Sequence, residues 1–149
     1  MTSKRRLHHK RQATGFTLIE VLITIVIVSI LSAVAIPSYR EYVIRGNIPE
    51  ATSRLATKQV QMEQFFQDNR TYVGGTGCTA DSTSSKYFDF SCAGVSATAF
   101  TITATGKSSM VGFSYTINQT GAKTTAGVPS GWSTPSPNSC WATKKGGTC

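Results

Sequence analysis

The stretch Gly15-Phe16-Thr17-Leu18-Ile19-Glu20 joins a basic leader to an apolar run that continues to Pro37. Residues 16–36 match the length of a bilayer-spanning helix, and in lipid every backbone polar group must be paired within the helix. Glu20 is the only charged side chain in these residues, and an acid near the middle of a membrane helix costs about 2.5–3.5 kcal/mol. The sequence therefore predicts a membrane-spanning helix in which Glu20 meets a positive partner after the helix leaves the bilayer.

The positive charge is concentrated near the N-terminus. The 149 residues contain 15 Lys and Arg and 7 Asp and Glu, a formal net charge of +8. The basic residues that precede Gly15 are Lys4, Arg5, Arg6, Lys10 and Arg11. Without them, ten basic and seven acidic residues remain, a net charge of +3. Because positive residues beside an apolar segment hold that end in the cytoplasm, the leader charge indicates membrane orientation more than nucleic-acid binding.

A different kind of processing is an alternative for this N-terminus. Ala33-Val34-Ala35 resembles the small-residue cleavage site of an ordinary secretory signal, which would release a soluble domain starting at Ile36. The apolar run is longer than the core of such signals and contains Glu20, which disfavours this interpretation. Glu20 could also be a lone carboxylate that reaches a membrane face, but that leaves the Gly15-Phe16 junction unexplained.

The basic leader, Gly15, Phe16, Glu20 and Pro37 together resemble the N-terminal signal of type IV pilins and of the related secretion pseudopilins. The resemblance implies that a prepilin peptidase cuts between Gly15 and Phe16 and then methylates the new amine of Phe16. It also implies that Glu20 neutralises the N-terminal amine of a neighbouring subunit during filament assembly. A carboxylate and an ammonium are each unfavourable in an apolar filament core, and pairing removes much of that penalty.

The same resemblance divides the chain into a leader peptide (residues 1–15), a transmembrane and assembly helix (16–36) and a periplasmic globular head (37–149). Before assembly the chain would cross the inner membrane once, with its leader in the cytoplasm and its head in the periplasm. After assembly it would belong to an extracellular pilus. The partners expected are other pilin subunits, the prepilin peptidase, the inner membrane and the pilus assembly machinery.

Past Pro37 the sequence predicts an amphipathic helix that faces the core of the head. Apolar residues recur at spacings near three, four and seven: Ile44, Ile48, Ala51, Leu55, Met62, Phe65 and Phe66. Pro37 removes one backbone donor and is expected to kink the helix. Gly46-Asn47-Ile48-Pro49 is a second weak point, where Pro49 and Glu50 could begin a new helical segment.

Strand-like alternation follows the glycine-rich loop at residues 74–77. The apolar members of the two clearest segments are Phe100, Ile102 and Ala104, and then Val111, Phe113, Tyr115 and Ile117. Residues 88–90 are expected to add an edge strand, and a turn at 118–121 to lead into a strand near 122–126. The predicted fold class is α+β, a long N-terminal helix packed on an antiparallel β-sheet, which is also the type IV pilin fold.

Four cysteines, Cys78, Cys92, Cys140 and Cys149, fit an oxidising compartment and allow three pairings. We favour Cys78–Cys92 and Cys140–Cys149 because each pair closes a local loop, and closing about 15 residues gains roughly 3 kcal/mol. A zinc site is disfavoured because the chain has no C-x-x-C pair and its two histidines lie in the leader. We expect no metal, no cofactor and no catalytic activity.

The C-terminal region from Trp132 to Cys149 resembles the disulfide-closed end of pilins, most like minor pilins of the PilE type. Trp132 and Trp141 are expected to pack beside the disulfide in preference to binding a ligand. Lys144 and Lys145 could contact anions such as DNA phosphates or surface glycans, although two lysines on a loop are more often simply solvated.

These features favour a structural subunit, specifically a minor pilin of a type IV pilus used for twitching motility and adhesion, with DNA uptake as a weaker prediction. A type II secretion pseudopilin and a major pilin are alternatives within the same family. A membrane-anchored or secreted disulfide-bonded binding domain is an alternative from another class.

Overall fold

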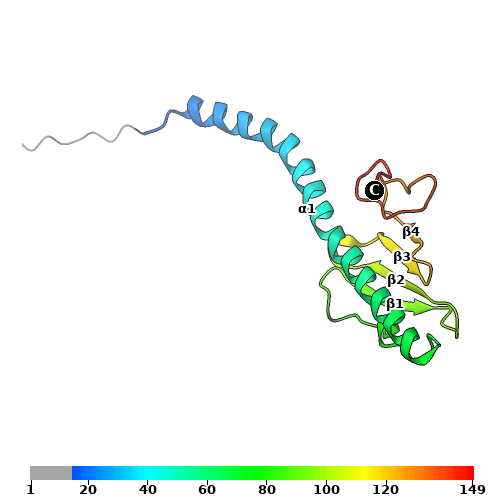
Figure 1. Ribbon diagram of the computed structural model, residues 1–149. Coiled ribbons are helices and arrows are strands. Elements are labelled where there is room, and N and C mark those ends of the chain that lie inside the picture. The colour runs from blue at the N-terminus through cyan, green and yellow to red at the C-terminus, as the bar shows by residue number, and fades with distance from the viewer. Residues whose placement is uncertain (1–14) are drawn as a thin grey trace, which may run out of the picture. The chain divides into compact units, whose positions relative to one another are not determined.

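One helix, α1 (Leu18–Asn69), accounts for most of the first half of the chain (Figure 1). The computed structural model describes residues 15–149, so the five basic leader residues and both histidines lie outside the described residues. The chain divides into two compact units, here called the N-terminal unit, which ends at Tyr39, and the head, Arg40–Cys149.

Thr17 caps the N-terminus of α1. Its hydroxyl oxygen accepts a hydrogen bond from the Glu20 backbone N at 3.3 Å, and its carbonyl accepts one from Val21 N at 3.2 Å. Farther along, the hydroxyls of Thr24 and Ser29 each donate to a carbonyl one turn back, at 2.6 Å. These polar side chains are satisfied within the helix, as a hydrocarbon environment requires.

The expectation of a new helical segment at Pro49 is wrong, because α1 continues through Gly46 and Pro49 without interruption. A proline removes only one backbone donor, and here its neighbours Ile48 and Ala51 are buried in the core of the head. Packing against the sheet therefore holds both sides of the proline in helical conformation. Pro37 also lies within α1, and the kink expected there stays a prediction.

Four strands form an antiparallel meander in the order β1-β2-β3-β4. Their bounds are β1 Phe88–Ala93, β2 Thr101–Gly106, β3 Ser114–Asn118 and β4 Lys123–Gly127. Figure 1 shows the C-terminal half of α1 lying across this sheet. The predicted α+β fold, a long helix on an antiparallel sheet, is confirmed.

The third strand begins later than its alternating pattern predicted. Val111 is outside the sheet and 66% exposed. It lies between a 3-10 turn, η2 (Ser108–Met110), and Gly112, both of which precede the start of β3. Gly112 has φ +95°, and a Cβ there would lie 3.0 Å from Pro129, so this position favours glycine on both counts. Phe113 is buried nonetheless, just before β3.

The core of the head is filled from both layers. Most of the predicted stripe on α1 is confirmed, with Ile48, Ala51, Leu55 and Met62 buried and Ile44 and Phe66 packed against them. Phe65, which was also predicted, is half-buried and does not belong to this cluster. The sheet and its loops contribute the remaining members of the core: Tyr72, Phe88, Phe90, Phe100, Ile102, Ala104, Met110, Phe113, Tyr115, Ile117 and Trp141.

Residues 128–149 contain no helix or strand and are held by side-chain contacts instead. The Tyr115 hydroxyl donates to Ala142 O at 3.0 Å, and Trp141 Nε1 donates to Thr116 O at 2.8 Å. The Trp132 ring lies edge-on to Phe113, with centroids 4.8 Å apart. Both tryptophans therefore pack on the head, but Trp132 packs against Phe113, and the packing of Trp132 beside the disulfide stays a prediction.

The cysteines are paired as Cys78–Cys92 and Cys140–Cys149, the pairing favoured from the sequence. The first disulfide joins the 3-10 turn η1 (Thr76–Cys78), just beyond α1, to β1. The second closes the C-terminal loop, residues 140–149. Each disulfide thus fastens a segment that has little regular structure of its own.

Leu55→Ala is expected to lower the free energy of unfolding of the head by about 2–5 kcal/mol, because it opens a cavity at a fully buried position. Val60→Ala, an aliphatic truncation on the same helix at a position 53% exposed, should change it by less than about 0.5 kcal/mol. Urea unfolding of the full chain in nonionic detergent, followed by tryptophan fluorescence, measures both. Equal losses for the two variants would contradict this packing.

Candidate functional site

The N-terminal motif lies at the very start of α1. Gly15, Phe16 and Thr17 precede the helix, and Phe16 is 81% exposed. Glu20 is exposed and belongs to the first helical turn, where a negative charge interacts favourably with the helix dipole. A cut after Gly15 would therefore create an amine on Phe16, four residues before the Glu20 carboxylate of the same chain.

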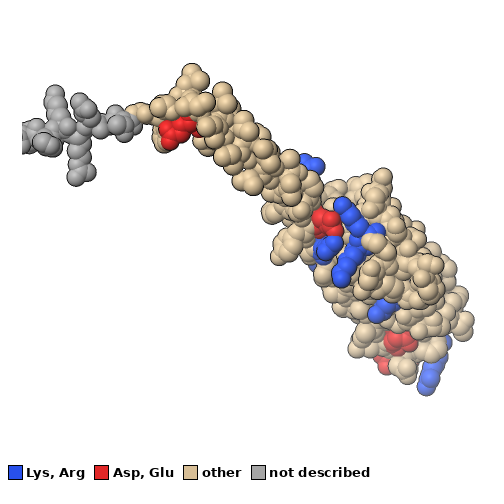
Figure 2. Space-filling model, turned by 90° about the horizontal axis from the view of Figure 1, so that it is seen from above, with Lys and Arg blue, Asp and Glu red and all other residues tan. Residues whose placement is uncertain are grey.

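The N-terminal unit presents an exposed apolar surface. Among the described residues, α1 is the one helix long and apolar enough to cross a membrane, and none of its most apolar stretch is buried. Figure 2 shows this surface without charged side chains, apart from an acidic patch near its beginning. The large exposed side chains from Phe16 to Ile36 are Phe16, Leu18, Ile19, Val21, Leu22, Ile23, Ile25, Val26, Ile27, Val28, Ile30, Leu31, Val34 and Ile36.

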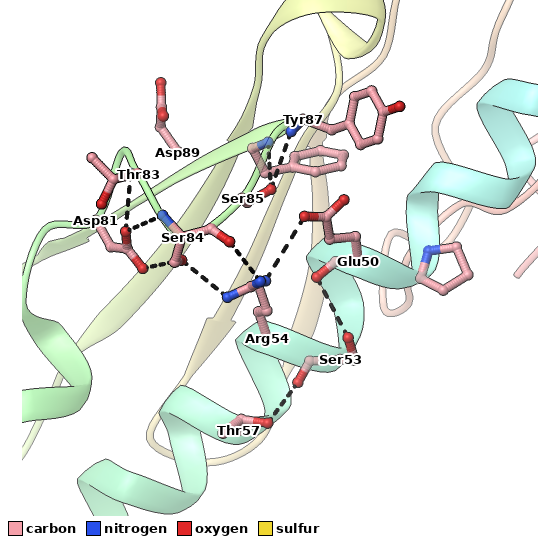
Figure 3. Close-up of polar contacts among 12 residues, drawn as sticks. Glu50, Ser53, Arg54, Thr57, Asp81, Thr83, Ser84, Ser85, Tyr87 and Asp89 are labelled. Carbon is pink, nitrogen blue, oxygen red and sulfur yellow. Dashed lines mark hydrogen bonds and ion pairs between the residues drawn. The ribbon is translucent and has the colours of Figure 1, made fainter.

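On the head, Arg54 fastens the loop between α1 and β1 to the helix (Figure 3). Its guanidinium donates to Ser84 Oγ at 3.0 Å and to Ser84 O at 2.7 Å, and it lies 3.9 Å from a Glu50 carboxylate oxygen. On the next turn, Lys58 Nζ donates to Thr79 O at 3.3 Å. Both cations are therefore used in holding the loop.

Asp81 organises the same loop from within. Its carboxylate accepts hydrogen bonds from the backbone N of Thr83 at 3.1 Å and of Ser84 at 3.0 Å, and from the Ser84 hydroxyl. These bonds, that of the Ser84 hydroxyl above all, lower the pKa of Asp81 to about 2. The ionised carboxylate orients Ser84, which in turn accepts the hydrogen bonds of Arg54.

A third cation connects this loop to the sheet. Lys107, which follows β2, donates from Nζ to Ser82 O at 2.5 Å and to Asp89 Oδ1 at 2.6 Å. The loop is thus tied to α1 on one side and to β1 and β2 on the other. With the Cys78–Cys92 disulfide it forms a braced surface segment.

The C-terminal loop is attached to the edge strand β4 by side chains. Asn138 Oδ1 accepts a hydrogen bond from Thr125 N, and Asn138 Nδ2 donates one to Thr125 O, both at 2.9 Å. The side-chain amide thus pairs with the backbone of β4 as the peptide group of a neighbouring strand would. The buried Thr125 hydroxyl donates to Cys140 O and accepts from Ala142 N, both at 2.8 Å. These bonds bring the disulfide loop against the sheet.

Exposed lysines gather around this loop. We use the name loop lysines for Lys123, Lys144 and Lys145, all of which are exposed. Lys123 Nζ lies 4.8 Å from the centre of the Trp141 ring, and both residues line a groove of about 380 Å³ between α1 and the loop. No Asp or Glu occurs after Asp89, so all charged side chains in this part of the head are positive.

One carboxylate meets the loop lysines from α1. Glu41 Oε2 lies 3.2 Å from Lys145 Nζ, and Glu41 Oε1 accepts a hydrogen bond from Arg45 one turn away. On the face of the head in Figure 2, basic side chains lie beside acidic ones in this manner. The Glu41 carboxylate therefore neutralises part of the positive charge of the loop lysines.

Within residues 15–149 there is no group of three or more His, Cys, Asp or Glu side chains that could hold a metal ion. All four cysteines are joined in disulfides.

Two family models match the chain. A model described as the prokaryotic N-terminal methylation motif covers residues 10–36. A second, described as type IV minor pilin ComP, DNA uptake sequence receptor, covers residues 37–124, more than half of the chain.

Curated relatives agree with these matches. The chain is 32% identical over 104 residues to the fimbrial protein EcpC of Eikenella corrodens, covering 68% of each chain. It is 36% identical over 67 residues to a fimbrial protein of Moraxella nonliquefaciens, and 35% over 72 residues to one of Neisseria meningitidis serogroup B. These two matches span 44% and 42% of the relatives' lengths. No solved structure matches the chain significantly.

The fold and the N-terminal motif are typical of membrane-anchored, filament-forming subunits, in which a long apolar helix continues into a head that contains an antiparallel β-sheet. The chain belongs to the type IV pilin family, as the family models and the fimbrial relatives show. That family consists of structural subunits and not of enzymes. The long apolar helix therefore fits a membrane-anchored precursor that becomes part of a pilus.

Sequence reasoning missed three residues whose polar side chains fix local structure. The cap at Thr17 could have been predicted from its T-x-x-E spacing to Glu20, which is the spacing of a capping box. The turn at Asp81 could have been predicted from the Asp-Ser-Thr-Ser run of residues 81–84, which is typical of turns closed by side chains. Asn138 has no such local signal, because its partner Thr125 lies on another segment.

The Asp81 carboxyl should titrate in the folded head with a midpoint near pH 2, below its ordinary value of 3.8. Because the folded pKa is depressed, the loop is stabilised above about pH 4 and loses this contribution as the pH falls towards 2. NMR titration of the Thr83 and Ser84 amide shifts measures the midpoint, with Asp81→Asn as the control that removes it. A midpoint at 3.8 would contradict the described hydrogen bonds.

Proposed function

We propose that this chain is a minor pilin that is processed at its N-terminus, enters a type IV pilus and presents its head as a receptor for DNA. The observation that carries the proposal is the match of residues 37–124 to the minor-pilin model, because this match lies in the head.

Processing takes place at the junction before the helix. A prepilin peptidase cuts between Gly15 and Phe16 and methylates the Phe16 amine, a step supported by the match to the N-terminal methylation motif. Residues 1–15 are then the leader, 16–36 the transmembrane and assembly helix, and 37–149 the periplasmic head. The basic leader keeps the N-terminus in the cytoplasm before the cut.

Assembly moves the apolar helix from lipid into the filament core, among other pilin subunits. In this core the Glu20 carboxylate pairs with the Phe16 amine of a neighbouring subunit. The position of Glu20 in the first turn of α1 supports the role, because the carboxylate is near the end of the helix and exposed. The pair also sets the register of one helix against the next.

DNA binding is supported by the description of the minor-pilin model and by the charges on the head. The loop lysines are exposed, and the residues after Asp89 include no carboxylate side chain, so that among the described residues only Glu41 on α1 forms an ion pair with a loop lysine. Phosphate contacts supply most of the salt-dependent affinity of proteins for DNA.

Glu20→Ala should leave processing intact and reduce the amount of this subunit in sheared pili by at least roughly tenfold, since removing one partner of a buried ion pair costs about 3–5 kcal/mol. Immunoblots of the pilus and membrane fractions measure incorporation, and the size of the membrane form reports processing. Ser29→Ala, which removes a hydroxyl bonded only within the helix, is the matched control. Normal incorporation of the Glu20 variant would rule out the charge pair.

Lys144→Gln with Lys145→Gln should weaken binding of the full chain to duplex DNA and reduce the salt dependence of the binding constant. The slope of log K against log salt should fall by about 0.9 for each phosphate that the variant no longer neutralises. Arg70→Gln with Lys86→Gln removes the same charge elsewhere on the head and is the control. Equal changes of the slope for both double variants would contradict a specific contact between the loop lysines and DNA phosphates.

A further inference from the structure

The feature that remains unexplained is the placement of a carboxylate against the loop lysines. Glu41 lies on α1 near the start of the head, and its two oxygens meet two cations, Arg45 and Lys145. The Lys145 side chain is 53% exposed, whereas that of Glu41 is only 24% exposed. The acid is therefore partly covered, while the amine that it neutralises faces solvent.

Glu41 is ionised in this arrangement. The hydrogen bond from Lys145, followed by the charges of Arg45 and Lys145, lowers the pKa of the Glu41 carboxyl, while burial acts in the opposite direction. At neutral pH the three side chains therefore carry one net positive charge instead of two.

The ion pair is not required to hold the loop in place. Ser133 N donates to Lys145 O at 2.9 Å, Thr143 N donates to Thr148 O at 2.8 Å, and the disulfide closes the loop. Asn138 fastens the same segment to β4. An exposed ion pair adds little to stability, so the main effect of Glu41 is on the charge available to a ligand.

We propose that Glu41 is an intramolecular competitor for Lys145, which a DNA phosphate must displace, and that it thereby makes the head selective for polyanions over single anions. This inference rests on the DNA-receptor function proposed above. A single anion that displaced Glu41 would interact with Lys145 about as strongly as the carboxylate does, so its binding would gain little. A polyanion gains further contacts and releases counterions, so it can displace Glu41 at a net gain.

Glu41→Gln tests the proposal, with Asp68→Asn as the control of equal charge change at an exposed position near the end of α1. The full chain in nonionic detergent is titrated with a short DNA duplex at low salt. We expect the Glu41 variant to bind roughly fivefold more tightly than the natural chain, and the Asp68 variant to stay within about twofold. Adding Lys145→Gln to the Glu41 variant should remove the gain.

The proposal is overturned if the Glu41 variant binds DNA no more tightly than the Asp68 variant. It is also overturned if the Glu41 variant binds more weakly than the natural chain, because Glu41 would then only support the loop. Heparin chromatography separates this inference from the DNA function. If the natural chain binds no duplex, the DNA function fails. Later elution of the Glu41 variant than of the Asp68 variant then still supports competition for Lys145, and equal elution overturns it.

Discussion

The apolar helix surface from Phe16 to Ile36 is the constraint on which the rest of the molecule depends. Within residues 15–149, none of its most apolar stretch is buried. Burying one large apolar side chain gains roughly 1.5–3 kcal/mol, so the whole run outweighs the roughly 5–15 kcal/mol that stabilises a typical domain. The helix must therefore be covered by lipid or by neighbouring subunits. A pilin satisfies this requirement if lipid covers the helix before assembly and neighbouring subunits cover it in the pilus.

The charge on Glu20 has to be judged against that apolar surface. A carboxylate costs about 2.5–3.5 kcal/mol near the centre of a membrane helix, which is small beside the gain from the surrounding apolar side chains. The precursor can thus carry Glu20 without losing its membrane anchor. In the filament proposed above, the same carboxylate would discriminate between registers, because only one alignment would place it beside the Phe16 amine of a neighbouring subunit.

The regular parts of the fold were predictable because their signals are local and repeated. The stripe of Ile48, Ala51 and Leu55 predicted the buried face of α1, and alternation predicted β2 and most of β3. Val111 followed the same alternation but lies outside the sheet, because η2 and the left-handed Gly112 interrupt the strand. At Pro49 the packing of the flanking residues outweighed a local helix-breaking signal.

The site was predictable only where it lies in a continuous motif. Gly15, Phe16 and Glu20 stand together in the sequence, so their relation needs no knowledge of the fold. By contrast, Arg54 and Ser84, Asn138 and Thr125, and Glu41 and Lys145 are brought together by the packing of separate segments. Lys145 was visible as a loop lysine, yet the carboxylate that neutralises it lies about a hundred residues earlier in the chain.

In the proposed function these two parts have separable tasks, with the helix providing anchorage and assembly and the head providing recognition. Both tasks depend on where the mature chain begins, because the amine that Glu20 would meet exists only after a cut at Gly15. Mass spectrometry of the N-terminal peptide of the purified mature subunit measures this directly. We expect a chain that begins with N-methylated Phe16. A chain that begins at Ile36, or that keeps its leader, would contradict the proposed assembly.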